Sequence, residues 1–266
     1  MITNIELTDK EFELFQKLIF KLIGITLENS KKLLVKNRLF KQILHYKLNS
    51  YSDYYRLVQI NPKEKVTMID LITTNETYFF REESHFKFIQ NFIIPKFKDE
   101  KLRIWSAASS VGAEAYSLAM ILDKNVKLYE ILGSDINNEV INKANIGLYP
   151  LKWMNKIPDS LKKRYCLKGK GQHEGWFLID RELLKNISFS VKNLLELQNN
   201  IGTFDVILLR NVLIYFNKET KEKIINNILR NLKVGGYFII SLTEHIDNLD
   251  IKNIKHIQSS IFQKVA

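Results

Sequence analysis

Hydrophobic residues at the start of the chain recur every three or four positions, the spacing of one face of an α-helix. The segment Thr8-Asp9-Lys10-Glu11 has the arrangement of a capping box and Gly24 ends the periodic run, so a first helix is predicted between them. A second helix is expected to take Asn29 or Ser30 as its cap. Two shorter helices are predicted over residues 52–60 and 63–72. Residues 1–72 are therefore predicted to form a small all-helical domain.

From about residue 84 the pattern changes to short apolar runs that alternate with amphipathic segments. The runs of strand length are residues 102–106, 129–134, 204–209 and 237–242. Alternation of this kind predicts an α/β domain with a mainly parallel sheet between helices, assigned here to residues 84–266. Its first helix is expected to stop at Pro95, and the run 257–265 is expected to return as an antiparallel edge strand.

One part of this domain departs from the alternation. Glycines and two apolar runs, 176–179 and 187–191, indicate a hairpin-like β insertion rather than another pair of helices. We assign the inserted β subdomain to residues 153–191. Residues 73–83, between the helical domain and the α/β domain, are interpreted as a linker that contributes to the active site.

Composition adds two constraints. The single cysteine, Cys166, fits a reducing compartment, and neither a signal-peptide pattern nor an apolar run of ~18 residues is apparent, so a cytoplasmic protein without membrane insertion is expected. The formal net charge is +11. It reflects either a Lys-, Asn- and Ile-rich composition or a partner with negative charge, such as nucleic acid, a membrane surface or an acidic protein segment.

The first candidate site follows the strand that ends at Ser106. The loop 107–112 contains one glycine, Gly112, so the Gly-x-Gly-x-x-Gly fingerprint for a pyrophosphate is absent. Its small residues leave room for a bulkier ligand without phosphate, such as S-adenosylmethionine. Asp135 ends the next strand about 20 residues on, where an acid that binds ribose hydroxyls is expected. The alternative for Asp135 is a cap of the helix that follows Asn137.

A third strand, 204–209, delivers Arg210, Asn211 and Tyr215 at or beyond its carboxyl end. Open α/β sheets bind their ligands at this end. Methyltransferases that act on base amino groups usually place prolines there, and no proline occurs after Pro158, which argues against that class.

Several motifs at compatible spacings resemble the CheR-type chemoreceptor methyltransferases over about residues 8–264. The matching segments are Thr73-Thr74-Asn75-Glu76-Thr77-Tyr78-Phe79-Phe80-Arg81, Trp105-Ser106-Ala107-Ala108, Tyr116-Ser117-Leu118-Ala119, Ser134-Asp135-Ile136, His173-Glu174-Gly175 and Arg210-Asn211-Val212-Leu213-Ile214-Tyr215-Phe216. The resemblance implies a Rossmann-like methyltransferase that transfers a methyl group from S-adenosylmethionine to receptor glutamates, leaving S-adenosylhomocysteine.

The resemblance also implies roles for individual residues. Cofactor contacts are expected from Asn75, Thr77, Arg81, Glu114, Asp135, Asn193, Leu194, Arg210 and Asn211. Arg81 and Tyr215 are expected to line the methyl-transfer site, with Arg81 orienting the substrate carboxylate. Nothing in the chain has metal-ligand spacing, and no metal is expected.

The resemblance further implies how the substrate is recognised. Cationic residues of the second helix are expected to face the cytoplasmic domain of a methyl-accepting receptor: Lys32, Lys36, Arg38 and Lys41. The alternative is a merely solvated face. The β insertion around residues 168–175 is expected to add a strand to a C-terminal receptor peptide. A monomer that binds no nucleic acid is expected.

The chain departs from the family pattern in two places. Gly112-Ala113-Glu114-Ala115-Tyr116-Ser117 stands where Gly-Glu-Glu-Pro-Tyr-Ser is usual, and Ser241-Leu242-Thr243-Glu244 replaces a Gly-His-Ser-Glu pattern. These departures keep open a non-catalytic module that binds receptor or cofactor. The positive charge keeps open an RNA methyltransferase.

Overall fold

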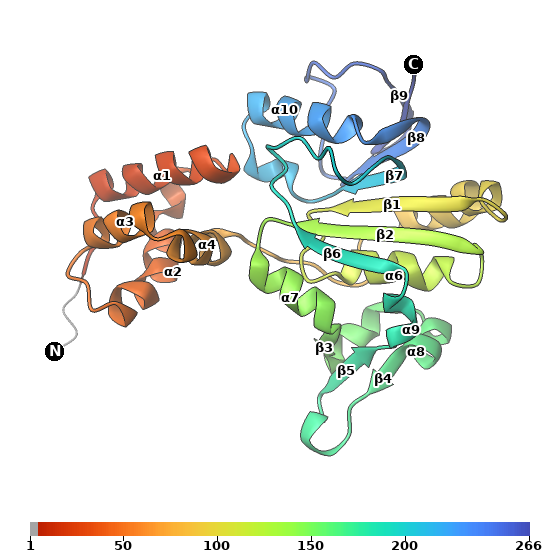
Figure 1. Ribbon diagram of the computed structural model, residues 1–266, viewed down its shortest axis with the longest axis horizontal. Coiled ribbons are helices and arrows are strands. Elements are labelled where there is room, and N and C mark those ends of the chain that lie inside the picture. The colour runs from red at the N-terminus through yellow and green to blue at the C-terminus, as the bar shows by residue number, and fades with distance from the viewer. Residues whose placement is uncertain (1–4) are drawn as a thin grey trace.

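The computed structural model describes residues 5–266 as a helical domain, a larger sheet domain and a small β subdomain (Figure 1). The helical domain lies to one side of the main sheet, and an extended segment connects the two. The β subdomain protrudes from the lower side of the sheet domain in this view. Within the described residues, no helix has both the length and the apolar character needed to cross a membrane.

The helical domain follows the predicted pattern closely. Its α-helices are α1 (Asp9–Ile23), α2 (Lys32–His45), α3 (Tyr51–Ile60) and α4 (Pro62–Ile72). The capping box is present, because the Thr8 hydroxyl accepts from the Glu11 backbone N–H and the Glu11 carboxylate accepts from the Thr8 backbone N–H. Gly24 ends α1 with a φ of 74°, a left-handed conformation that glycine adopts without strain.

The start of the second helix differs from the prediction. Asn29 and Ser30 provide no side-chain cap for α2 and lie instead in a 3₁₀ turn, Asn29–Lys31, that runs directly into the helix. The sequence pattern located the start of the helical segment correctly but not its geometry, because small polar residues occur both in 3₁₀ turns and at the caps of α-helices.

The sheet domain begins with a helix whose pitch changes along its length. The helix α5 (Glu83–Phe88) continues as a π-helical turn, Ile89–Ile93, and then a 3₁₀ turn, Ile94–Lys96. The helix was predicted to stop at Pro95, but the 3₁₀ turn includes that residue at its start, where its missing N–H costs no hydrogen bond.

The main sheet is seven-stranded with the order β6-β2-β1-β7-β8-β10-β9. Its strands are β1 (Lys101–Ala107), β2 (Leu128–Asp135), β6 (Ile187–Val191), β7 (Phe204–Leu209), β8 (Leu232–Ile240), β9 (Ile254–Gln258) and β10 (Ile261–Lys264). The strands from β6 to β8 are parallel, and β10 and β9 are antiparallel. Every residue of β7 is buried, as expected for a central strand covered on both faces.

Helices cover both faces of this sheet. They are α6 (Ala113–Leu122), α7 (Asn138–Ile146), α9 (Arg181–Leu184) and α10 (Lys218–Leu229). Neighbouring residues of one strand belong to different cores: Ile104 packs with α6, and Trp105 packs with α10. This alternation follows from the two-residue period of a strand. The mainly parallel α/β fold expected from the sequence is confirmed.

Two predictions about β elements are wrong. The run 257–265 returns antiparallel, as predicted, but it is not one edge strand: it contains the end of β9, a turn and β10, and β10 lies between β8 and β9. The run 187–191, assigned to the insertion, is β6, which pairs in parallel with β2 in the main sheet. A short apolar run has the same appearance in a hairpin and at the edge of a parallel sheet, so the sequence did not distinguish them.

The β subdomain is an antiparallel sheet with the order β3-β5-β4. Its strands are β3 (Leu148–Pro150), β4 (Cys166–Lys168) and β5 (Trp176–Ile179), with the helix α8 (Asp159–Tyr165) before β4. The sheet therefore begins a few residues earlier than the predicted start at 153. Other domain boundaries assigned from the sequence stay predictions.

Candidate active site

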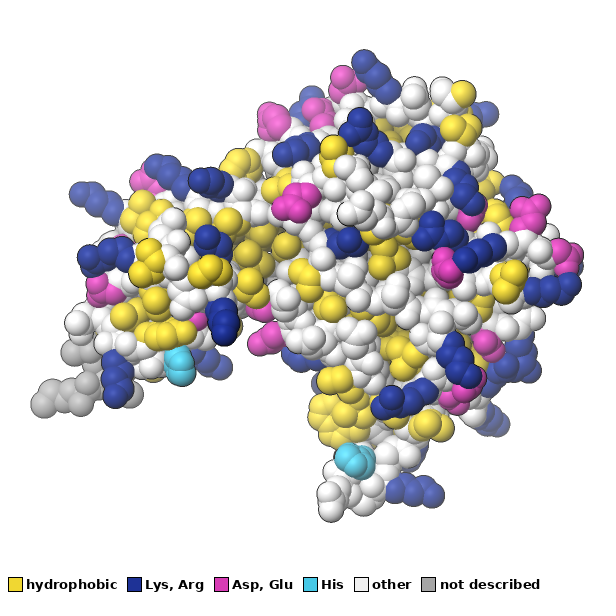
Figure 2. Space-filling model, viewed as in Figure 1, with side chains coloured by type: hydrophobic (Ala, Val, Ile, Leu, Met, Phe, Trp, Pro, Cys, Tyr) yellow, Lys and Arg dark blue, Asp and Glu magenta, His cyan; other side chains and the backbone are white. Residues whose placement is uncertain are grey.

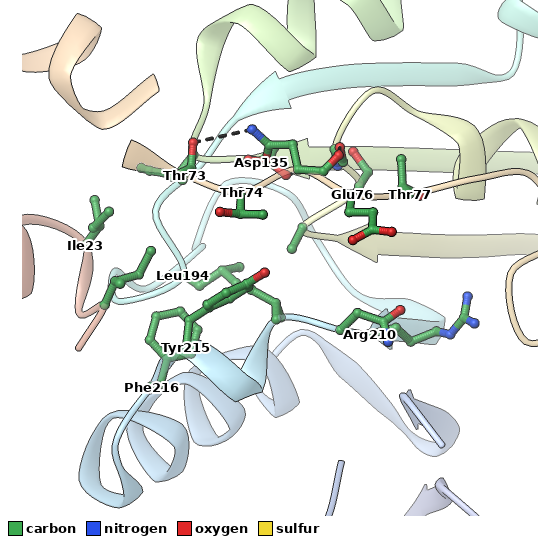
Figure 3. Close-up of a pocket in the computed structure, with 18 of the residues that line it drawn as sticks. Ile23, Thr73, Thr74, Glu76, Thr77, Asp135, Leu194, Arg210, Tyr215 and Phe216 are labelled. Atoms are coloured by element: carbon green, nitrogen blue, oxygen red, sulfur yellow. Dashed lines mark hydrogen bonds between the residues drawn. The ribbon is translucent and has the colours of Figure 1, made fainter. Parts of the chain in front are cut away.

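A cavity lies where the helical domain meets the carboxyl ends of β1, β2 and β7 (Figure 3). Its lining comes from the end of α1, the linker, and the loops that follow β1, β2, β6 and β7. In the figure, Thr74, Glu76, Leu194 and Tyr215 surround the space. Ligands of open α/β sheets bind at this edge, so the cavity is the candidate active site.

The loop after β1 is held in an unusual conformation. Ala108 and Ser110 have φ angles of 63° and 51°, which cost a residue with a side chain about 1–3 kcal/mol each. Two bonds to the end of β2 fix the loop. The backbone N–H of Ser109 donates to the Ser134 carbonyl at 2.8 Å, and that of Ser110 donates to the Asp135 carboxylate at 2.9 Å. The floor of the cavity is thus rigid, with backbone and small side chains exposed to a ligand.

Asp135 lies at the end of β2, as predicted, and is 7% exposed. Its second oxygen accepts from the backbone N–H of Asn137 at 3.0 Å. Burial raises the pKa of Asp135 and outweighs the opposing effect of these backbone bonds. Asn137, not Asp135, caps α7, because its side chain accepts from the Val140 N–H. The helix-cap alternative for Asp135 is therefore excluded, and its carboxylate borders the cavity.

Arg210 is the centre of a buried charge cluster beside the cavity. Its side chain is 2% exposed and lies between Glu114, at 2.5 Å, and Glu82, at 3.1 Å. It also donates to the Arg81 backbone carbonyl. Glu114 in turn accepts from the Ser106 hydroxyl at 2.7 Å. The cluster joins β1, α6, the linker and β7 at one point, which none of these segments could do alone.

Glu82 is the residue of this cluster that the sequence analysis missed. It has a left-handed φ of 58°, and its carboxylate accepts from Ser241, Asn211 and the Leu242 backbone N–H. Burial opposes ionisation, but these bonds and the Arg210 charge outweigh it and lower the pKa of Glu82 to about 2. The available signal was its position directly after Arg81, at the end of the linker motif.

The segment 241–244 has a structural role that explains one departure from the family pattern. The buried carboxylate of Glu244 accepts from the backbone N–H groups of Ser241, Asn211 and Leu213. Burial raises its pKa above the ordinary value, although the backbone bonds oppose the rise. Asn211 has a φ of 58°, so the strained turn after β7 depends on these bonds. Of the three residues that differ from the pattern, Leu242 and Thr243 are exposed, and Ser241 is buried and donates its hydroxyl to Glu82.

Arg81 and Tyr215 both line the cavity, as expected. The Arg81 guanidinium donates to the Glu76 carbonyl at 2.9 Å and lies over the Tyr78 ring, 5.7 Å from its centre. Tyr215 lies on the opposite wall, and Figure 3 shows its hydroxyl directed into the space. Burial raises the pKa of Tyr215, and the charges of Arg81 and Arg38 oppose the rise. Arg81 and Tyr215 thus place a cation and a phenol in the lining of the same cavity.

The remaining expected cofactor residues also line the cavity: Asn75, Thr77, Asn193, Leu194 and Asn211. Two of the side chains are committed elsewhere. The Asn211 amide donates to Glu82 and Ser241, and the Asn193 amide donates to the Leu22 carbonyl of α1 at 2.9 Å. These side chains hold the walls of the cavity in place, so their backbones rather than their amides face a ligand.

The basic residues of α2 are less available than the sequence implied. Lys32 pairs with Asp9 and Lys36 with Glu6, each at 2.6 Å. Arg38 donates to the Ile72 and Thr73 carbonyls and to the Thr74 hydroxyl, so it fastens α2 to the linker. Lys41 is exposed. Figure 2 shows Lys and Arg side chains spread over this face of the helical domain, with hydrophobic side chains between them.

The cavity fits S-adenosylmethionine. Two buried polar atoms of lining residues have no hydrogen-bond partner within residues 5–266, namely the Ser109 hydroxyl and Nε of Arg210. Buried polar groups normally have partners, so these atoms are available to a polar ligand. Asp135 places a carboxylate at the cavity, and Ile136 and Leu194 line it with apolar side chains. The loop 107–112, which leads into α6, contains one glycine and so is not the glycine-rich loop that binds a phosphate group.

An open, mainly parallel sheet with this cavity at its carboxyl edge is the arrangement of a nucleotide-type binding domain, and a lining that fits S-adenosylmethionine points to the methyltransferases that use this cofactor. Sequence comparison agrees. The profile of the CheR methyltransferase SAM-binding domain matches residues 75–262, and that of the CheR methyltransferase all-alpha domain matches residues 10–73. The chain belongs to the CheR methyltransferase family.

Curated relatives match nearly the whole chain. The chemotaxis protein methyltransferase of Salmonella typhimurium is 34% identical, over 94% of this chain and 88% of its own length. Chemotaxis protein methyltransferase 2 of Pseudomonas aeruginosa is 34% identical over 90% and 87%. The chemotaxis protein methyltransferase of Borreliella burgdorferi is 32% identical over 98% and 96%. The resemblance and the cofactor inferred from the sequence are confirmed.

Proposed function

We propose that this protein transfers the methyl group of S-adenosylmethionine to glutamate side chains of chemotaxis receptors, forming glutamyl methyl esters. The observation that carries the proposal is that Arg81 and Tyr215 line the same cofactor cavity, near enough for the Arg81 charge to affect the pKa of Tyr215. A carboxylate that enters there meets a guanidinium on one side and a phenol on the other. The related chemotaxis protein methyltransferases support the same reaction.

The chemistry places modest demands on the protein. The cofactor supplies an electrophilic methyl group on a sulfonium. A glutamate side chain is already ionised near neutral pH, since its ordinary pKa is about 4.3, so its oxygen needs no general base. The protein must hold the carboxylate in line and exclude water. Arg81 orients the carboxylate through a charge-assisted hydrogen bond, and Tyr215 forms a wall of the methyl channel and donates to the substrate.

The substrate is proposed to be the cytoplasmic domain of a methyl-accepting receptor, bound against the helical domain. Lys31, at the start of α2, lines the cavity, and Lys41 is exposed on the same helix. These cations favour an acidic surface and increase its rate of encounter at low salt. Lys32 and Lys36 contribute to the field, although each has an acidic neighbour. The protein is proposed to act as a cytoplasmic monomer.

The decisive experiment is transfer of radiolabelled methyl groups to purified receptor, with RNA as a parallel substrate. We expect label on the receptor that is released as methanol by mild alkali, because carboxyl esters hydrolyse there. A receptor with its methylated glutamates changed to alanine is the matched control and should take up no label. Label on RNA alone, or on neither substrate while adenosylhomocysteine still binds, would overturn the proposal.

We also propose that the β subdomain binds the C-terminal peptide of a receptor. Within residues 5–266, β4 is an edge strand that pairs with β5 on one side, and its other side can add an extended peptide. Leu167 and Trp176 are 53% and 43% exposed, and Figure 2 shows hydrophobic side chains on this subdomain. Such binding would raise the local concentration of methylation sites.

Deletion of residues 168–175 tests the peptide proposal, because this segment connects β4 to β5. Methylation of a full-length receptor should fall, and methylation of a receptor without its C-terminal tail should be unchanged. If both receptors lose the same fraction of activity, the subdomain is only part of the scaffold.

A further inference from the structure

The end of α1 is joined to the catalytic domain by contacts that converge on Tyr215. The backbone N–H of Thr26 donates to the Tyr215 carbonyl at 3.0 Å. The preceding residue, Ile25, pairs with Phe216 as an antiparallel β-bridge. The segment 22–27, which links the first two helices, therefore meets the turn that carries the active-site tyrosine.

Gly24 makes this approach possible. Its φ of +74° turns the chain at the end of α1, and a Cβ atom there would lie 2.9 Å from Thr220 and 3.0 Å from Leu195. Both neighbours belong to the catalytic domain. A larger residue would thus be strained in its backbone and would press against the loop that lines the cavity. The close packing of the end of α1 against the catalytic domain therefore requires a glycine at position 24.

Asn193 ties the same boundary from the other side. Its Nδ2 donates to the Leu22 carbonyl at 2.9 Å, while its Oδ1 accepts from the Leu195 N–H at 3.1 Å. The bonded carbonyl is at the end of α1, where helical carbonyls lack partners within the helix. The adjacent residue, Leu194, lines the cavity. Both ends of the Asn193 amide are thus used to set the position of Leu194 and α1.

The turn that carries Tyr215 is consequently held from two directions. Glu244 accepts from the N–H groups of Asn211 and Leu213 on the catalytic side, and Thr26 donates to Tyr215 on the helical side. The ring of Tyr215, between these anchors, faces the cavity (Figure 3). If the helical side is released, the anchors from Glu244 remain but the carbonyl of Tyr215 has lost its donor.

We propose that the segment 22–27 of the helical domain is a positioning element for the cofactor and for Tyr215, with Gly24 as its turn and Asn193 as its tie. The helical domain then does more than present a surface to the substrate: it completes the cofactor site. Asn193 and Gly24 are positioning residues, since they act through Leu194 and Tyr215. The inference deepens the proposed function and rests on it only for the part that concerns methyl transfer.

The test uses two pairs of variants in the full-length protein. Asn193→Asp keeps the acceptor for Leu195 but replaces the donor to Leu22 by an oxygen. Its control is Asn231→Asp, which removes a comparable amide tie to the Gln198 and Gly202 carbonyls within the catalytic domain. Gly24→Ala is matched by Gly235→Ala, which has a similar φ of +81° but no atom within 4 Å of the added Cβ.

Adenosylhomocysteine affinity by calorimetry is the first measurement, and it needs no receptor. We expect Asn193→Asp and Gly24→Ala to weaken binding about tenfold, since one hydrogen bond is lost and replaced by repulsion or strain. The controls should bind like the wild type. Thermal melting of all four variants identifies any loss that is due to unfolding.

Steady-state methylation is the second measurement. At saturating cofactor, kcat of Asn193→Asp and Gly24→Ala should still be lower than that of the wild type, because Tyr215 stays misplaced after the cofactor has bound. If their affinity and kcat per folded molecule match those of the controls, the segment 22–27 is only structural and the inference fails. If the wild type binds adenosylhomocysteine but methylates no receptor, the proposed function fails, while the affinities still decide the role of the segment 22–27.

Discussion

Two regions of this molecule contain ion pairs between cations and carboxylates, and the pairs have different effects. In the cluster around Arg210, two carboxylates and a guanidinium are almost fully removed from water. On the surface of the helical domain, Lys32 pairs with an Asp9 side chain that is 95% exposed. A buried pair is costly to break because one charge is left without a partner, whereas an exposed pair adds little. The position of a charge, more than its presence, therefore decides what it does for the site.

The most direct test of this difference removes one cation from each region and compares the losses of stability. Arg210→Ala should lower the free energy of unfolding by about 3–5 kcal/mol, because Glu82 and Glu114 would remain buried without a counter-charge. Lys32→Ala should lower it by less than about 1 kcal/mol. Urea unfolding of both variants measures the difference. Equal losses would mean that burial does not distinguish the two regions.

The pH dependence of stability tests the same cluster. The pKa of Glu82 is about 2 in the folded protein and near 4.5 when unperturbed, so its contribution is fully present above pH 4.5. It is lost as the pH falls toward 2, because the unfolded state then binds the proton first. The urea midpoint of the wild type should fall more steeply between pH 4.5 and 3 than that of Glu82→Gln. If the urea midpoints of the two proteins fall in parallel with pH, ionisation of Glu82 does not contribute to the stability of the cluster.

Asp135 lies between the two extremes, since it is buried but borders the cavity. Asp135→Ala should weaken adenosylhomocysteine binding by about 1.5–3 kcal/mol for each ribose hydrogen bond lost, as measured by calorimetry. The variant should also melt earlier, because the N–H groups of Ser110 and Asn137 lose their acceptor. Saturating adenosylhomocysteine should raise the melting temperature of the wild type more than that of the variant. Unchanged affinity would refute the ribose role.

Arg81 tests the partly exposed cation at the edge of the cavity. Arg81→Ala should reduce kcat for receptor methylation about tenfold or more, through loss of a charge-assisted bond to the substrate. Its melting temperature should change little, since the Arg81 guanidinium contacts the Glu76 carbonyl and the Tyr78 ring at the surface of the cavity. Arg81→Lys keeps the charge and should recover part of the activity. A large stability loss with normal turnover per folded molecule would make Arg81 structural.

The smallest effect is expected at the lysines of α2, of which Lys41 is exposed and Lys32 and Lys36 are half-buried. Changing Lys32, Lys36 and Lys41 together to glutamate should raise the KM for receptor about threefold to tenfold at low salt and less at physiological salt, because exposed charges are screened. The control is the same reversal at three exposed lysines of the sheet domain, Lys98, Lys252 and Lys255. The same change in KM for both triple variants would assign the effect to net charge instead of to α2.

The sequence predicted local structure well and long-range partners poorly. The helices from α1 to α4 and the strands β1, β2 and β7 have clear periodicity and end signals, so their existence followed from single segments. The strand β6 was misplaced because a five-residue segment with three apolar positions does not indicate which strand it pairs with.

The candidate site shows the same division between local and distant information. Residues at strand ends, such as Asp135 and Arg210, were identified because the fold places that edge at the ligand. Glu82 and Glu244 were missed as parts of the site, since their partners lie far away in the chain and leave no local pattern. A buried arginine at a strand end does require an acidic partner, and that requirement was the signal to follow.

The lining of the cavity begins at Ile23 and ends at Phe216 along the chain. The linker and the helix α5 that follows it form bonds still later, when Glu82 accepts from Ser241 and His85 bonds with Ser260. During synthesis on the ribosome the helical domain emerges first and can fold, but the cofactor site has no second wall until most of the protein has been made. A product of premature termination before residue 241 therefore retains the helical domain without a completed cofactor site.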